Sequence, residues 1–319
     1  MTNYIGRRLI LNFVVLLFVA SLVFFATRAL PSDFAEKRLA TSLEITDQTA
    51  AVQQARKELG LDKPLWQQYV IFLGDLATGD LGRSYETHRS TWQEVSRRLG
   101  PTLQLSVATM LIAYSMSIPI GVLSAVKQNQ WLDYVLRGFA VLGVAMPQFV
   151  TALFLSLLVV KLSLFEIDVV GRPNLWTDPE AAVKLYAIPA LAGGIAGGAG
   201  VMRILRSQML EVMRQDYIRT ARSKGLRDRN VWLHHALKNA MLPVLTVFGF
   251  TLGGLISGQI ILENMFNIDG VGRFLFTSLN TRDFPPFQGT VLIIATVVVT
   301  VNLAVDVMYA WLDPRIRYT

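Results

Sequence analysis

The chain has 319 residues, of which 52% are hydrophobic and only 17% are charged, and its mean hydropathy is +0.42. Several runs of about 20 apolar residues exclude an ordinary soluble domain and indicate a multispan membrane protein. The net charge of +7 does not indicate nucleic-acid binding, because the basic residues gather in loops beside the apolar runs. The absence of Cys excludes disulfides, thiolate metal sites and Cys nucleophiles, and the three His are too few for a His-rich metal site.

The first predicted span covers about residues 9–26 and follows Arg7 and Arg8. A basic pair before an apolar run is also typical of a secretory signal, but this run is longer than a usual signal core and further spans follow. We therefore interpret residues 1–30 as a cytoplasmic N-terminus and an uncleaved first transmembrane helix.

Residues 31–101 are polar and mixed in charge, and they predict a small external helical subdomain between the first and second spans. One helix is expected over about 47–59, and a second is expected to begin with Pro64 in its first turn. A third is expected after the capping box formed by Ser90 and Gln93. The second helix has an apolar face made of Leu65, Tyr69, Phe72 and Leu76.

Residues 102–319 are predicted to form a transmembrane core with five further spans, which makes six in all. The approximate ranges are 102–126, 134–160, 185–205, 240–262 and 288–312. Pro119 and Pro147 lie inside the second and third spans and free backbone carbonyls there. Such prolines fit either helices that bend around a pathway or passive kinks in the packing.

The fourth and fifth predicted spans carry small residues at helical spacing, which permit close approach of two membrane helices. These stripes fit helix packing, and they also fit the lining of a conduit at an interface with a second such subunit. The candidates for pathway lining or helix packing are Pro147, Gly194, Gly198, Gly249, Gly253 and Gly258. Asp306, in the sixth span, is expected to have a structural partner or to relay protons.

The most basic loop lies between the fourth and fifth spans, over residues 203–240. From 203 to 238 it has nine Lys or Arg and three acids. A short helix is expected inside it, with Asp216 as the N-terminal cap, Lys224 in the last turn and Gly225 as the left-handed residue that follows.

The distribution of Lys and Arg predicts that both termini are cytoplasmic. The short segments assigned to the cytoplasm hold 14 basic residues, and the short external loops hold four. Residues 31–101 are left out of this count because a segment of that length is a weak indicator of orientation.

The basic loop resembles the cytoplasmic "EAA" loop of ABC-importer permeases, in the branch that imports dipeptides and oligopeptides. The matching stretches are DYIRTARSKGL from Asp216, HALKNA from His235, and Leu242-Pro243. Two features favour the peptide branch: Arg219 stands where many members have Glu, and Pro243 lies further from Gly225 than in sugar importers. Further stretches that resemble the same permeases are residues 59–64, 79–84, 102–105, 263–266, 270–273, 282–285 and 313–318.

This resemblance implies a six-span, all-α permease of the type I ABC-importer kind, whose short loop helix couples to an ATPase subunit. The implied coupling residues are Asp216, Tyr217, Ile218, Arg219, Thr220, Ala221, Arg222, Lys224 and Gly225. Of these, Ile218, Thr220 and Ala221 are expected at the contact itself. The alternative is a basic loop that only sets the topology.

The sequence contains no Gly-x-x-x-x-Gly-Lys-Ser/Thr phosphate loop and no catalytic constellation, so we expect no enzyme activity on this chain. The resemblance implies that ATP and Mg are bound by two separate ABC ATPase subunits. It also implies a second homologous permease, an external substrate-binding protein, contact with membrane lipid, and a location in a bacterial or archaeal inner membrane.

The cargo predicted from the resemblance is a dipeptide or oligopeptide, with nickel, glutathione or an oligosaccharide as alternatives. A more distant alternative is an ion-coupled secondary transporter or channel, which would need internal repeats or several intramembrane charges. The sequence shows no convincing repeat and little intramembrane charge besides Asp306. A membrane enzyme is the third alternative.

Overall fold

The computed structural model describes residues 2–30, 48–58, 60–165 and 173–312. Inside some helices only the backbone is described, including residues 250, 252–253, 255–258 and 306–312. In the described ranges the regular secondary structure is helical, apart from one isolated bridge between Arg83 and Ser90. The expected all-α fold is therefore confirmed for this part of the chain.

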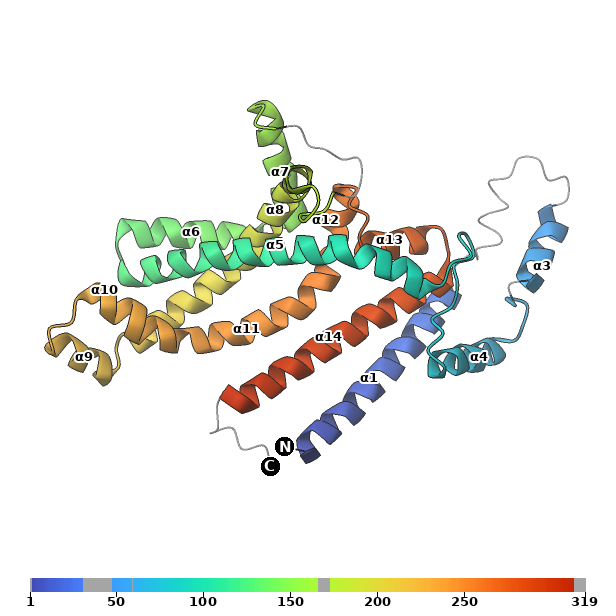
Figure 1. The fold of residues 1–319 in the computed structure, drawn as a ribbon, viewed down its shortest axis with the longest axis horizontal. Coiled ribbons are helices and arrows are strands. Elements are labelled where there is room, and N and C mark those ends of the chain that lie inside the picture. Colours follow the sequence, from blue (N-terminus) through green and yellow to red (C-terminus); the bar gives the residue numbers. More distant parts are fainter. Residues whose placement is uncertain (1, 31–47, 59, 166–172, 313–319) are drawn as a thin grey trace.

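Long helices run side by side, with short helices at both ends of the bundle (Figure 1). The first half comprises α1 (Thr2–Ala29), α3 (Gln48–Glu58), α4 (Leu65–Ala77), α5 (Thr91–Val126), α6 (Trp131–Ala145) and α7 (Gln148–Lys161). The second half comprises α8 (Pro179–Val212), α9 (Asp216–Ser223), α10 (Asp228–Asn230), a π-helix (Val231–Ala236), α11 (Leu237–Gly258), α12 (Ile260–Met265), α13 (Val271–Asn280) and α14 (Phe284–Leu312).

Four helices in the described part are long and apolar enough to cross a membrane: Gly6–Ala29, Thr91–Val126, Pro179–Val212 and Phe284–Val305. The pair α6 and α7 adds a fifth if it is taken as one span that bends by 110°. The four helices correspond to the first, second, fourth and sixth predicted spans, and the pair α6 and α7 corresponds to the third. The α11 helix is not among them, so six spans remain a prediction.

The second predicted span is longer than expected because α5 begins eleven residues earlier, at Thr91. The capping box of Ser90 and Gln93 is present and starts this helix. The helix continues through Pro101, since its first turns are held by packing of the buried Val95 against Val271 and Ile294. The third predicted external helix and the second span are therefore one continuous helix.

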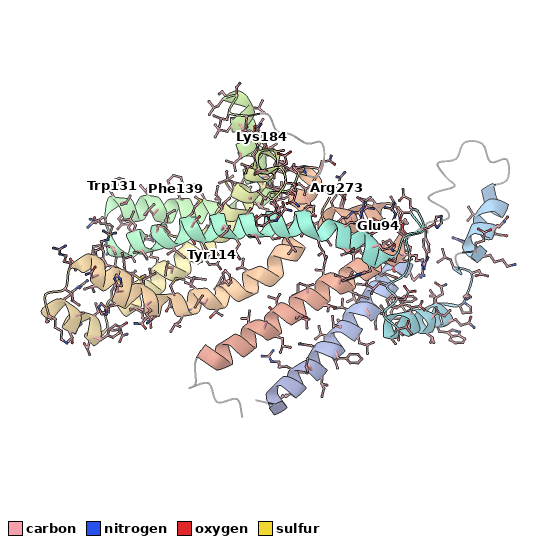
Figure 2. The ribbon with its side chains drawn as sticks, in the orientation of Figure 1. Glu94, Tyr114, Trp131, Phe139, Lys184 and Arg273 are labelled. Atoms are coloured by element: carbon pink, nitrogen blue, oxygen red, sulfur yellow. The ribbon has the colours of Figure 1, made fainter. Side chains whose placement is uncertain are left out.

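The predicted interruption of the third span at Met146-Pro147 is confirmed. Met146 is extended and ends α6, and Pro147 stands just before α7 with φ of −57°. Because proline has no N–H to donate, it can open a helix but cannot continue the preceding one. The exposed Trp131 and Phe139 mark α6 at the end of the bundle opposite Glu94 (Figure 2).

At that opposite end, α4 packs against the last turns of α1. The Tyr69 hydroxyl lies 2.7 Å from the Ser21 hydroxyl, and the rings of Phe72 and Phe24 stack with centroids 5.3 Å apart. Pro64 occupies the position before α4, rather than its first turn, and Leu65 is exposed. The predicted apolar face of this helix is therefore used from Tyr69 onward.

Candidate functional site: a short basic helix and the network behind it

The candidate coupling helix α9 is present, with ends that differ slightly from those predicted. Gln215 is the extended residue before the helix, and Asp216 is its first helical residue. The prediction that Asp216 caps the helix is wrong; its carboxylate instead accepts a 3.3 Å hydrogen bond from Arg219. Gly225 has φ of +76°, which confirms the predicted left-handed residue beyond the C-terminus.

One face of α9 is turned into the chain's own core. Ile218 is fully buried and Ala221 is 7% exposed, and both belong to an apolar cluster with Leu205, Met209 and Val231. The expectation that Ile218 and Ala221 touch a partner directly is therefore corrected. Their side chains pack α9 against the end of α8 and against the π-helix.

The other face of α9 is exposed and basic. Its exposed members are Asp216, Tyr217, Arg219, Thr220, Arg222 and Ser223, and Lys224 directly after the helix is exposed as well. Tyr217 is 44% exposed, and its hydroxyl accepts a 2.9 Å hydrogen bond from Asn239 in α11. The Arg222 guanidinium lies 3.6 Å from the Asp228 carboxylate. This face has the charge and accessibility to dock on an acidic protein surface.

A buried ion pair behind α9 joins three long helices, and the sequence analysis did not predict it. Asp133, at the start of α6, is fully buried. It accepts hydrogen bonds of 2.9 and 2.8 Å from the Arg206 guanidinium in α8, and one of 2.6 Å from Ser124 in α5. Arg206 lies only ten residues before Asp216. We call this group the Asp133–Arg206 clamp.

Three of the stretches that resemble the permease family, residues 102–105, 263–266 and 270–273, meet around the buried Glu263, at the end of the bundle away from α9. Its carboxylate accepts hydrogen bonds from the Thr102 hydroxyl, at 2.7 Å, and from the backbone N–H of Arg273, at 2.9 Å. A side chain at Gly270 would collide with this carboxylate. The glycine therefore lets Glu263 approach the N-terminus of α13, although burial raises the pKa of the carboxyl above its usual range.

Two further stretches that resemble the family, residues 79–84 and 282–285, contact each other through Ser84 and Asp283, which are 199 residues apart. The Ser84 hydroxyl donates to Asp283 at 2.5 Å, and the backbone N–H of Tyr85 donates to the same carboxylate at 2.9 Å. Gly82 has φ of +80° and lies so close to Pro285 that an added Cβ would stand 2.8 Å from it. Burial raises the pKa of Asp283 despite these hydrogen bonds. The loop before α5 is thereby fastened to the start of α14.

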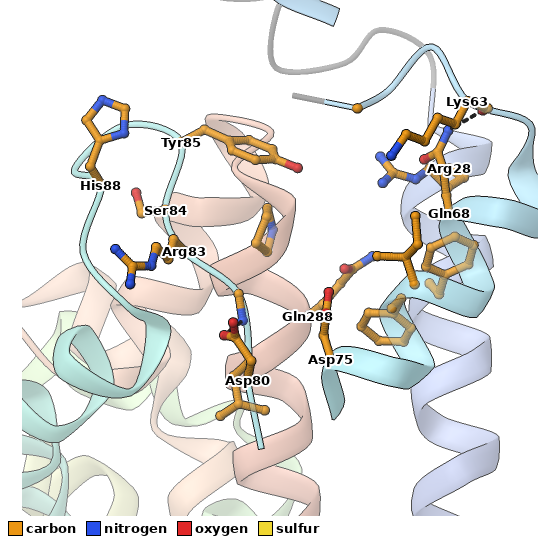
Figure 3. A pocket seen from close by; sticks show the side chains of 17 residues that line it. Arg28, Lys63, Gln68, Asp75, Asp80, Arg83, Ser84, Tyr85, His88 and Gln288 are labelled. Carbon is orange, nitrogen blue, oxygen red and sulfur yellow. Dashed lines mark hydrogen bonds between the residues drawn. The ribbon is translucent and has the colours of Figure 1, made fainter. Parts of the chain in front are cut away.

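A cavity of about 380 Å³ lies beside that fastened loop (Figure 3). The loop before α5 supplies one wall, with Tyr85 and His88, and α4 supplies the other, with Gln68 and Asp75. Both basic and acidic side chains line it. In the described part of the chain no group of three or more His, Asp or Glu has the geometry of a metal site.

Gly194 and Gly198, two of the six pathway candidates, pack tightly in the bundle. An added Cβ on Gly194 would stand 2.6 Å from Ile112, and one on Gly198 would stand 2.8 Å from the carbonyl oxygen of Ala113. These two glycines also line an apolar cavity of about 330 Å³ between α5, α6 and α8.

The other four candidates are less closely defined. A side chain on Gly249 would collide with Val305 of α14, and Pro147 is exposed at the bend between α6 and α7. Gly253 and Gly258 lie outside the residues whose side-chain positions are described, as does Asp306.

Residues 117–318 match the family described as binding-protein-dependent transport system inner membrane component, and residues 1–106 match the N-terminal family of the same membrane components. The chain is similar to a dipeptide transport system permease of Alkalihalophilus pseudofirmus, at 36% identity over the whole of both chains. It is 37% identical to a glutathione transport system permease of Pectobacterium atrosepticum, again over the whole of both. A dipeptide permease of Escherichia coli K12 is 39% identical over 83% of this chain and 85% of its own.

The family match covers more than half of the chain, and its residues include the basic helix α9 and the Asp133–Arg206 clamp behind it. Two of the relatives align with the chain from end to end. On both grounds, the chain belongs to the family of binding-protein-dependent transport system inner membrane components.

Proposed function

We propose that this chain is one of two permease subunits of an ATP-driven importer, and that the cargo is a dipeptide or oligopeptide delivered by an external binding protein. The observation that carries the proposal is the similarity to permeases named for dipeptide transport, over the whole of both chains for one and over 83% of this chain for the other. Family membership makes the chain a transport permease of the inner membrane, rather than an enzyme. Glutathione is itself a tripeptide, so the glutathione permease relative favours the same chemical class of cargo.

The coupling step of the proposal assigns the ATPase contact to the exposed face of α9. Two ATPase subunits would bind the ATP and Mg, and closure of the pair would push on Tyr217, Thr220 and their basic neighbours. The buried Ile218 and Ala221 would pass this movement to α8. Such a bundle has two states, and ligands at its two ends shift the population between them.

The proposed topology has six spans, both termini and α9 in the cytoplasm, and residues 31–101 on the outer side. It is supported by the bias of basic residues and by the position of α9 and α4 at opposite ends of the bundle (Figure 1). The helices Gln48–Glu58 and Leu65–Ala77 are consistent with a small external helical subdomain. A second homologous permease would complete the pathway.

Uptake in cells that lack this chain tests the cargo. We expect loss of uptake of a radiolabelled dipeptide and its recovery when the gene is restored. Nickel and oligosaccharide uptake should be unchanged. Retained dipeptide uptake together with lost nickel uptake would overturn the peptide assignment. The ligand that co-purifies with the cognate binding protein gives an independent measurement, and a peptide is the expected result.

A further inference from the structure

The second helix of the predicted external subdomain reaches into the depth of the first span. Tyr69 of α4 meets Ser21 of α1 at 2.7 Å, and Ser21 lies eight residues before Ala29, the last residue of α1. At 1.5 Å per residue this is roughly 12 Å back along the axis of a helix that crosses the membrane. The contact therefore places the middle of α4 below the end of the apolar segment of α1, rather than beyond it.

The side of α4 that does not face α1 is apolar and uncovered. Trp66 is 66% exposed and Val70 is 60% exposed. These side chains continue an apolar surface on α1, where Leu22 and Phe25 are also more than half exposed. The centroids of the Phe25 and Tyr69 rings lie 5.1 Å apart, so α1 and α4 are in aromatic contact beside these exposed side chains.

The polar side of the same helix points elsewhere. Asp75 is the only charged residue of α4, and it lines the cavity in Figure 3 together with Gln68. Gln68 also donates hydrogen bonds to the carbonyl oxygens of Leu61 and Lys63. The helix thus has an aqueous side toward the cavity and an apolar side continuous with the lipid-facing surface of α1.

From this arrangement we infer that α4 is a membrane-interface helix, with Trp66 and Val70 inserted among the phospholipids of the leaflet at the C-terminal end of α1. Tryptophan favours this level of a bilayer, and an amphipathic helix there buries its apolar face at the boundary of headgroups and acyl chains. We favour lipid over a protein partner because this apolar side of α4 lies beside the exposed apolar side chains of α1, which cross the same leaflet. The inference rests on α1 crossing the membrane, and it is independent of the cargo.

Spin labels on single cysteines test the inference directly, because the chain has no natural Cys. The variants Trp66→Cys and Val70→Cys probe the apolar side, Leu22→Cys is the matched lipid-facing control, and Asp75→Cys is the control on the polar side. Each full-length variant is labelled and reconstituted into vesicles of phosphatidylethanolamine and phosphatidylglycerol. Collision rates with oxygen, which partitions into lipid, and with a water-soluble nickel chelate are then measured.

We expect the ratio of oxygen to nickel collisions at 66 and 70 to equal the ratio at 22, and to exceed the ratio at 75. Equal ratios at 66, 70 and 75 would overturn the inference, because they would place the apolar side of α4 in water. Low collision rates with both reagents at 66 and 70 would also overturn it, because they would show that a protein surface covers the helix. The readout does not involve transport, so either outcome leaves the proposed function standing.

Discussion

At the scale of single residues, Gly225 has a role that depends on its backbone rather than its packing. Its φ is +76°, and an added Cβ would meet no atom within 4 Å. The cost of Gly225→Val is therefore conformational, about 1–2 kcal/mol, and it changes the angle at which the chain leaves α9. We expect normal membrane insertion but loss of substrate-stimulated ATP hydrolysis in the reconstituted complex.

Gly197→Ala is the control for that experiment. Gly197 also has open space around it, but it lies inside α8 with an ordinary helical backbone. Alanine is favoured there over glycine, so this variant should keep full coupling. Near-normal stimulated ATP hydrolysis in Gly225→Val would show that the angle at which the chain leaves α9 is not needed for coupling.

Because one face of α9 is buried and the other is exposed, a new carboxylate should have a different effect on each face. Ala221→Glu would place a carboxylate in the apolar cluster around Ile218, so we expect a lower melting temperature of the chain as well as lost coupling. Thr220→Glu adds the same group on the exposed face, so the melting temperature should stay unchanged while stimulated ATP hydrolysis falls. Equal melting temperatures for both variants would contradict the inward orientation of Ala221.

The buried carboxyl of Asp283 predicts a pH dependence. Burial raises its pKa, so the folded chain takes up a proton at a higher pH than the unfolded chain does. The free energy of unfolding therefore falls as the pH rises from the ordinary carboxyl range through the raised pKa, and it levels off above that. Asp283→Asn removes this ionisation while an oxygen still accepts from Tyr85.

Melting temperatures of the detergent-solubilised chain, measured from acid to neutral pH, check this sign. Wild type should gain stability relative to Asp283→Asn as the pH is lowered. A wild type that instead loses stability relative to Asp283→Asn on acidification would show that the carboxyl prefers its ionised form.

At the scale of helices, the Asp133–Arg206 clamp is the connection whose loss should cost most. Arg206→Met leaves a fully buried carboxylate without its cation, and breaking a buried pair in this way costs about 3–5 kcal/mol. The double variant Asp133→Leu with Arg206→Met removes both charges and should recover much of that loss. Thermal unfolding of the two single variants and the double variant gives the coupling energy.

A second ion pair on α8 supplies the control for the clamp. Lys184 and Glu180 lie 2.6 Å apart, but their side chains are 38% and 81% exposed. Lys184→Met should therefore change the stability by less than about 1 kcal/mol, because solvent screens exposed pairs. If Arg206→Met were equally mild, the clamp would not hold α5, α6 and α8 together.

At the scale of the whole molecule, single cysteines can establish the topology. We expect Arg222→Cys, on α9, to be protected from a membrane-impermeant thiol reagent in intact cells and to react once the cells are opened. Asp62→Cys, beside α4, should react in intact cells. Reaction of position 222 from outside would overturn the orientation, and the absence of natural Cys makes the readout clean.

The sequence by itself determined the membrane class, the basic loop and several helix ends. Local interactions decide these features: apolar runs set the spans, the box of Ser90 and Gln93 starts α5, and Gly225 supplies a left-handed backbone. Predicted helix boundaries were wrong where packing between distant residues outweighed the local sequence pattern. Packing of Val95 against Val271 and Ile294 holds the first turns of α5, which runs on through Pro101, whereas the sequence pattern predicted a separate external helix and a span from about residue 102.

Only the tertiary structure decided which way a helix face points and which distant groups meet. Periodicity placed Ile218 and Ala221 on one face of α9, but the neighbouring core, rather than a partner, occupies that face. The pairs Ser84–Asp283 and Asp133–Arg206 join residues 199 and 73 positions apart. Such contacts depend on how whole helices pack, because a buried charge or hydroxyl takes whichever partner the packing brings within reach.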